Sequence, residues 1–157
     1  MCWQCDNPHR TTEDYLDVLR AIIRTHRWAV QYVEGEDQPF GYTVGLHRLG
    51  LPELMIMGLP PEESACVLRS IAHDMVDDGR DLRPPLHINF QGELFLEVVK
   101  VEHPDVHLGA AVALFGPDIR ALQLVWTDDH SSWPWDRGWI HGRRRQPVLG
   151  QRTRLAG

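Results

Sequence analysis

The sequence lacks any apolar run long enough to cross a membrane. A spanning helix needs about 20 consecutive apolar residues, and polar residues interrupt every hydrophobic stretch of this chain well before that length. The N-terminal residues also lack the basic and then apolar regions of a secretory signal. Cysteine is scarce, and its odd count of 3 does not suit the disulfide framework of a small secreted protein. We therefore expect a cytoplasmic protein without a membrane segment.

Clustered positive charge is also rare in this chain. The formal net charge is -6, and the acidic residues are spread along the sequence. The main basic cluster is Arg143–Arg145, followed by Arg152 and Arg154. Because a domain that grips nucleic-acid phosphates usually presents a basic face, nucleic acid is not the expected partner. We expect a solvated tail at the arginine-containing end, with docking of an acidic partner or RNA as the alternative.

Several catalytic and nucleotide-binding motifs are missing as well. Gly41, Gly45, Gly50 and Gly58 fit neither the dinucleotide fingerprint nor the phosphate-binding P-loop. The chain has no nucleophile elbow of the hydrolase type either. No motif in the sequence therefore identifies a reaction, and the substrate and the oligomeric state stay open.

The hydrophobic pattern predicts an α+β fold. With 157 residues the chain fits one globular domain over residues 1–150, with an N-terminal arm at 1–10 and a polar tail at 151–157. The strands come in meander-like runs, which favours a mainly antiparallel sheet of about six strands or a small, partly closed barrel, with two main helices and one short helix. The expected helices are 12–26, 60–79 and 104–115, and the expected strands are 28–33, 40–46, 53–58, 86–91, 94–101 and 120–126.

The N-terminal Cys2-Trp-Gln-Cys5 segment is the most chemically suggestive motif. Two thiolates spaced by two residues can hold one tetrahedral metal ion, and His103 and His107 offer two more ligands on one helix face. These four residues predict a zinc site, structural or catalytic. The alternatives are different histidine ligands, or two reduced cysteines without a metal; the other candidate ligands are His9, His73, His87 and His130.

Aromatic and polar residues suggest two further functions. Tyr42, Thr43 and His47 lie beside apolar strands and, with Trp126, could contact a planar ligand such as a flavin. The tryptophan-rich segment 126–139, together with the arginine tail, could instead dock a protein partner. Large aromatic residues are also typical core formers, and Cys66 is expected to pack in the second helix as a small apolar residue. Asp128-Asp-His130 is expected to be a solvated turn, with an acid–base cluster as the alternative.

Several motifs together resemble the bacterial domain-of-unknown-function family numbered 4262, in the style of its actinobacterial branch with an N-terminal CxxC. The resemblance spans nearly the whole chain and implies a cytoplasmic stand-alone domain. It implies no reaction and no catalytic residue. A looser similarity links Tyr42-Thr-Val-Gly-Leu46 to flavin-reductase-like split barrels, which is an analogy of fold only. The family motifs are Met1-Cys-Trp-Gln-Cys-Asp6 with Pro8, Gly41-Tyr-Thr-Val-Gly-Leu46, Leu51-Pro-Glu-Leu54 with Gly58-Leu-Pro60, His103-Pro104 with His107, Leu122-Gln-Leu-Val-Trp126, Trp133-Pro-Trp-Asp136 and Gln146-Pro147.

Overall fold

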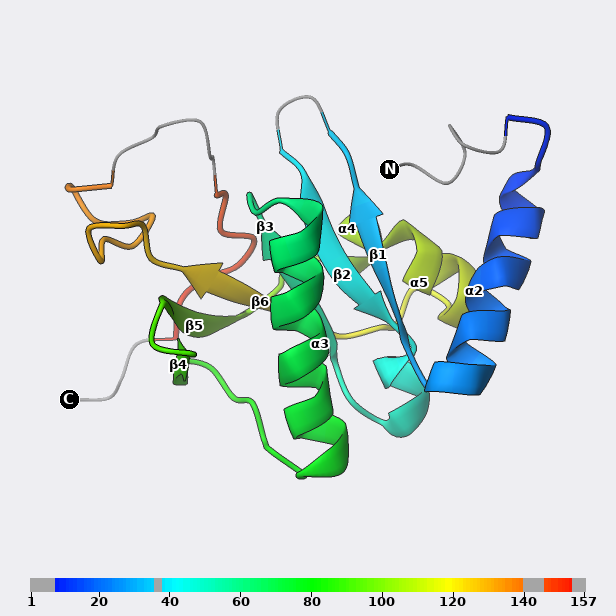
Figure 1. Ribbon diagram of the computed structural model, residues 1–157, viewed down its shortest axis with the longest axis horizontal. Coiled ribbons are helices and arrows are strands. Elements are labelled where there is room, and N and C mark those ends of the chain that lie inside the picture. The colour runs from blue at the N-terminus through cyan, green and yellow to red at the C-terminus, as the bar shows by residue number, and fades with distance from the viewer. Residues whose placement is uncertain (1–7, 36–37, 140–145, 154–157) are drawn as a thin grey trace.

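The fold is a single six-stranded sheet with helices on both faces (Figure 1). The computed structural model describes residues 8–35, 38–139 and 146–153. In spatial order the strands are β1-β2-β3-β6-β5-β4. The elements are α2 (Thr12–His26), β1 (Ala29–Val33), β2 (Phe40–Val44), the 3-10 helix η1 (Leu46–Leu49), β3 (Glu53–Met57), α3 (Pro61–Asp77), β4 (His87–Phe90), β5 (Leu94–Lys100), α4 (Pro104–His107), α5 (Gly109–Phe115) and β6 (Ala121–Trp126).

Local sequence signals set the N-terminal starts of the two long helices. The Thr11 side chain accepts a hydrogen bond from the Asp14 amide, and the Asp14 carboxylate accepts one from the Thr11 amide. This reciprocal capping box starts α2 at the residue that the sequence predicts. Proline in the first turn suits the start of α3, where the amide is not needed for a helical hydrogen bond. The predicted α+β class is confirmed.

The order of the strands differs from a simple meander. Four of the five strand pairs are antiparallel, as expected, but β3 pairs with β6 in parallel. The chain leaves β3 through α3, forms the β4–β5 hairpin, and then returns β6 to the gap between β3 and β5. The sheet is open, because β1 and β4 are its two edges. It therefore does not form the partly closed barrel that the sequence left as a variant.

The short helix expected at 104–115 is divided into α4 and α5. Leu108 lies between them with φ −99° and ψ 61°, which is outside the helical region. Its side chain is buried in the core between the sheet and α2.

Two apolar cores cover the two faces of the sheet. The α3-side core packs Leu68, Ile71 and Met75 of α3 against the sheet. The α2-side core packs Leu19 and Ile23 of α2, together with α5, against the opposite face. All residues of β3 and β6 are buried, because these central strands are covered on both sides. None of the helices in the described part of the chain combines the length and apolar character that spanning a bilayer requires.

Candidate functional site

Glu97 is a buried carboxylate that binds two basic side chains. It lies in the middle of β5, and its side chain is only 1% exposed. Arg152 donates from Nε to Oε2 (2.7 Å) and from Nη2 to Oε1 (2.9 Å). The Nε2 atom of His87 lies 2.7 Å from Oε1, because β4 and β5 pair these two residues directly in register. One carboxylate thus holds a two-pronged arginine contact and a histidine.

The basic partners keep Glu97 ionised. Burial of the carboxyl group raises its pKa, but the hydrogen bonds from Arg152 and His87 outweigh this effect, and the pKa of Glu97 is lowered overall. The hydrogen bond to Glu97 in turn raises the pKa of the Arg152 guanidinium. An ionised carboxylate only accepts hydrogen bonds, so His87 must donate from Nε2. With Nε2 donating, Nδ1 is the ring nitrogen that can accept a hydrogen bond.

An aromatic stack joins His87 to Arg152 by a second route. The ring centroids of His87 and Trp133 are 5.2 Å apart, and those of Trp133 and Trp135 are 5.3 Å apart with nearly parallel planes. The Arg152 guanidinium carbon lies 3.6 Å from the Trp135 ring centroid, a close cation–π contact. The five residues form a closed ring of contacts, which we call the Glu97 ring. Each end of the aromatic stack is fixed by the same carboxylate.

A cleft opens beside this ring at the β4 edge of the sheet. Its volume is about 1280 Å³, and the His87 side chain on its wall is 58% exposed. Glu97 is nearly sealed from water at the same wall. One edge of the His87 ring therefore faces the cleft, and the opposite edge is bonded to the buried Glu97 carboxylate. The lining residues are Arg83, Pro85, Leu86, His87, Glu97, Gln151, Arg152 and Thr153.

Two glutamines fix the C-terminal segment that carries Arg152. The Gln146 side chain accepts from the Trp126 amide and donates to the Trp126 carbonyl, as a neighbouring strand would. Gln123 donates to the Pro147 carbonyl and accepts from the Leu149 amide. The Glu102 amide donates to the Leu149 carbonyl. These contacts bring residues 146–149 along the sheet. Residues 151–153, at the start of the tail that the sequence predicts, are exposed, and Arg152 among them reaches back to Glu97.

Glu53 is a second buried carboxylate with a different environment. It is fully buried at the start of β3 and accepts from the Thr43 hydroxyl (2.7 Å) and from the amides of Gly45 and His47 (2.9 Å each). Burial raises its pKa, and these neutral donors offset only part of that effect. Thr43 also accepts from the Leu54 amide. Glu53 thus fixes the turn between β2 and β3.

The predicted metal ligands are only partly within the described residues. Cys2 and Cys5 lie outside them. His103 and His107 stand at the two ends of α4, with His103 in the left-handed backbone conformation (φ 55°). Among the described residues, no group of three or more histidine, cysteine, aspartate or glutamate side chains could hold a metal ion. Of the alternative ligands, His73 pairs with Asp77, and His87 belongs to the Glu97 ring.

The four residues predicted to bind a planar ligand do not converge. Tyr42 faces the α2-side core and accepts from the Ala110 amide, and its neighbour Thr43 faces the other side of β2. His47 stacks on Phe115. Trp126 donates to the Met57 carbonyl, at the end of β3 opposite to Glu53.

Other sequence predictions have mixed outcomes. The Asp128–His130 segment is a turn in which Asp128 accepts from the amides of His130 and Ser132. Cys66 is exposed, so its predicted packing as a small apolar residue is wrong. The basic cluster Arg143–Arg145 lies outside the described residues.

Sequence reasoning did not select Glu97 or Arg152 as site residues. The one signal for Glu97 is a glutamate inside the apolar strand segment Leu94-Phe-Leu-Glu-Val-Val99. A charged residue in such a segment is rarely buried unless it is paired. The sequence has no signal for its partner Arg152, which lies 55 residues away.

Comparison with known proteins gives one family. The model of the family described as "Domain of unknown function (DUF4262)" matches residues 22–140. The matched span contains His87, Glu97, Trp133 and Trp135 but ends before Arg152. The search of curated proteins found no match, and the search of solved structures found none either.

Proposed function

We propose that this chain, which belongs to the DUF4262 family, binds a small polar molecule in the cleft beside β4 and uses His87 to transfer a proton to or from it. The observation that carries the proposal is the pairing of a sealed carboxylate with an open imidazole. Glu97 is 1% exposed and His87 is 58% exposed, at 2.7 Å from each other. Carboxylate–imidazole pairs of this kind orient the ring and stabilise its protonated form.

The chemistry assigned to His87 requires its Nδ1 atom to be free. Nε2 is engaged by Glu97, and no described residue bonds to Nδ1. Glu97 cannot turn away, because Arg152 binds both of its oxygens. Trp133 contacts the imidazole ring and limits its rotation. The ring is therefore held in one orientation before a ligand arrives, which is what acid–base catalysis needs.

Hydrolysis of p-nitrophenyl acetate tests the acid–base role, because this ester needs no specific recognition. Nδ1 of His87 takes a proton from water while the water oxygen attacks the ester carbonyl. The p-nitrophenolate then leaves, acetate is released, and the proton returns to solvent. We expect His87→Asn to lower the protein-dependent rate at least about tenfold.

His73 supplies a matched control. Its side chain is also 58% exposed and is 2.9 Å from an aspartate, but that aspartate, Asp77, is itself exposed. We expect His73→Asn to leave the rate unchanged. Equal losses in the two variants would show general histidine reactivity and would overturn the proposal. Ligand binding is tested separately by a fragment screen with amide NMR. Fragments are expected to shift the signals of His87 and Thr153, and a screen with no such shifts contradicts binding in the cleft.

A zinc site made by Cys2, Cys5, His103 and His107 is a second candidate function. The observation that favours it is the backbone at His103, which is left-handed although the residue is not glycine. Such a conformation costs on the order of 1 kcal/mol and is often found where function constrains the chain. The cytoplasmic location expected from the sequence would keep both cysteines reduced and able to bind metal.

Elemental analysis tests the zinc proposal. Protein purified without a histidine tag should contain one zinc per chain, and the Cys2→Ser/Cys5→Ser variant should contain none. His103→Ala should also lose the metal, whereas His130→Ala should keep it. Absence of stoichiometric metal from the unaltered protein would rule the site out.

Flavin binding and protein docking stay predictions of the sequence. A flavin stacked on β2 would contact Tyr42 or Thr43 but not both, because they face opposite sides of the strand. A thermal shift with flavin mononucleotide is the direct test. In the tryptophan-rich segment, Trp133 and Trp135 belong to the Glu97 ring and Trp139 packs in the α3-side core. A partner would therefore meet residues that already have intramolecular contacts.

A further inference from the structure

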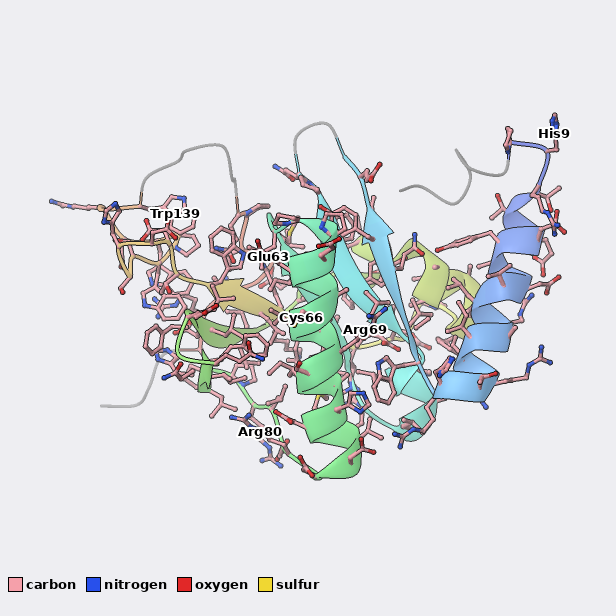
Figure 2. All side chains as sticks on the ribbon, in the orientation of Figure 1. His9, Glu63, Cys66, Arg69, Arg80 and Trp139 are labelled. Carbon is pink, nitrogen blue, oxygen red and sulfur yellow. The ribbon has the colours of Figure 1, made fainter. Side chains whose placement is uncertain are left out.

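A second pocket lies on the α3 side of the sheet and is separate from the cleft at His87. It has a volume of about 440 Å³, within the range of small-molecule sites. Its walls come from α3, from the β4–β5 turn and from the end of β6, and it shares no lining residue with the cleft. Figure 2 labels Glu63 and Cys66, which lie one turn apart on α3 and both line this pocket.

The charged groups that the described residues place on the pocket wall are all acidic. Glu63, Glu93 and Asp129 line it, and none of the described lining residues is basic. No described residue forms an ion pair with Glu93 or Asp129. Carboxylates from three different elements therefore meet at one hollow, in a chain whose net charge is already -6. Such a wall attracts cations and repels anions.

A threonine side chain in the same wall bonds to no described residue. Thr127 is only 6% exposed, and its amide donates to the Phe95 carbonyl. Its side-chain hydroxyl bonds to no group in the part of the chain that the structure describes, although it lines the pocket. A hydroxyl that faces a pocket and has no bond to the described residues can bond to water or to a ligand. The hydroxyl oxygen can accept a hydrogen bond from an ammonium group.

The floor of the pocket is apolar. Leu59, Val67 and Trp126 are buried there. A ligand that suits both the apolar floor and the acidic wall has a hydrocarbon body and a positively charged end. We propose that this pocket binds a small alkylammonium compound, with its ammonium group among the carboxylates and the Thr127 hydroxyl and its hydrocarbon part over Trp126.

The thiol of Cys66 allows a direct measurement, because it is exposed and lies on the pocket wall. A bound ligand should slow its alkylation by iodoacetamide, followed by peptide mass spectrometry so that Cys66 is read separately from Cys2 and Cys5. Pentylamine at about twice its dissociation constant should slow the reaction roughly threefold. Pentanol and pentanoate have the same chain without the positive charge and should give little protection.

Variants identify the groups responsible. The Glu93→Gln/Asp129→Asn double variant should remove the protection, and Thr127→Val should weaken it. Glu62→Gln is the matched control, because Glu62 is exposed on α3 but does not line the pocket. Added salt should reduce the effect of pentylamine, since the attraction is electrostatic.

Three results would overturn the proposal. They are equal protection by pentanol, full protection in the double variant, and much stronger protection by Nα-acetyl-lysine methylamide than by pentylamine. The last result would assign the pocket to a lysine side chain of a peptide. Amide NMR titration of Cys66→Ser with pentylamine provides a second measurement that does not depend on the thiol. Neither experiment involves His87, so this proposal and the one for the cleft succeed or fail separately.

Discussion

Glu53 and Glu97 are both buried in strands of one sheet, yet different kinds of donor satisfy them. Glu53 accepts from two backbone amides and a threonine hydroxyl, all neutral and fixed in place. Glu97 accepts from two long basic side chains, of which Arg152 is 42% exposed. The pKa of Glu53 is raised and that of Glu97 is lowered. Burial alone therefore does not decide the direction in which the pKa of a carboxyl group shifts; the charge of its donors does.

The difference also separates a structural site from a site open to ligands. The donors of Glu53 belong to the turn that the residue stabilises, and no cleft borders it among the described pockets. The donors of Glu97 come from β4 and from the C-terminal segment, and they line a cleft. A ligand in the cleft can contact the partly exposed side chains that hold Glu97, whereas the backbone amides that hold Glu53 belong to a turn.

Removing each carboxylate in turn should give the largest difference in the free energy of unfolding. We expect Glu53→Ala to lower the free energy of unfolding by about 3–4 kcal/mol, because it leaves two amides and a hydroxyl buried without partners. Glu97→Ala should cost only about 1–2 kcal/mol, because Arg152 and His87 can turn toward water. Urea unfolding of both variants measures the difference. Equal losses would mean that it does not matter whether the donors are exposed side chains or buried backbone amides.

Removing the arginine should leave Glu97 as a buried charge. We expect Arg152→Ala to lower the free energy of unfolding by about 2 kcal/mol at neutral pH, and Arg152→Lys to recover only part of it, because lysine lacks the two-pronged geometry. The pKa of Glu97 should rise in the alanine variant, as followed by the carboxyl carbon shift in NMR. An unchanged pKa would show that Arg152 does not set the charge.

Acidification should change the contributions of the two glutamates to the free energy of unfolding in opposite directions. The folded-state pKa of Glu97 is lowered, so its stabilisation is present above the ordinary glutamate value and is lost as the pH falls through the folded value. The folded-state pKa of Glu53 is raised, so folding gains stability from its protonation as the pH falls. On acidification, the advantage in unfolding free energy of the unaltered protein over the Glu97→Gln variant should shrink. Its advantage over the Glu53→Gln variant should grow. Two differences with the same sign of slope would contradict this assignment.

The smallest effect is expected at the outer wall of the cleft. Arg83 pairs with Asp81, and both side chains are largely exposed. Arg83→Gln should therefore change the free energy of unfolding by less than about 0.5 kcal/mol. Thermal unfolding checks this value, and a larger loss would show that the cleft wall contributes to the fold. A stable variant would also serve as a probe of ligand contacts at the cleft.

Periodicity and capping made most of the elements predictable. The capping threonine and the spacing of Leu19 and Ile23 predict the observed α2, and short apolar segments bounded by turn residues predict all six strands within a few residues. Cys66 was placed wrongly, because it lies next to the buried stripe of α3, where one step along the helix changes which face a residue occupies.

The candidate site was less predictable, because its members come from distant segments. The sequence indicates that the tryptophan-rich segment 126–139 could dock a partner, but not that Trp135 contacts Arg152 of this chain. His87 was one of several histidines without a distinguishing signal until β4 paired with β5 and placed it against Glu97.

The sequence by itself determined the fold class, the positions of the helices and strands, and the presence of two glutamates inside apolar strands. These features depend on residues close together in the chain, where propensity, capping and hydrophobic period act directly. Only the tertiary structure decided that β6 enters between β3 and β5, and that Arg152 reaches Glu97 across 55 residues. Those contacts depend on how the elements pack, and that packing decided which buried glutamate borders a cleft.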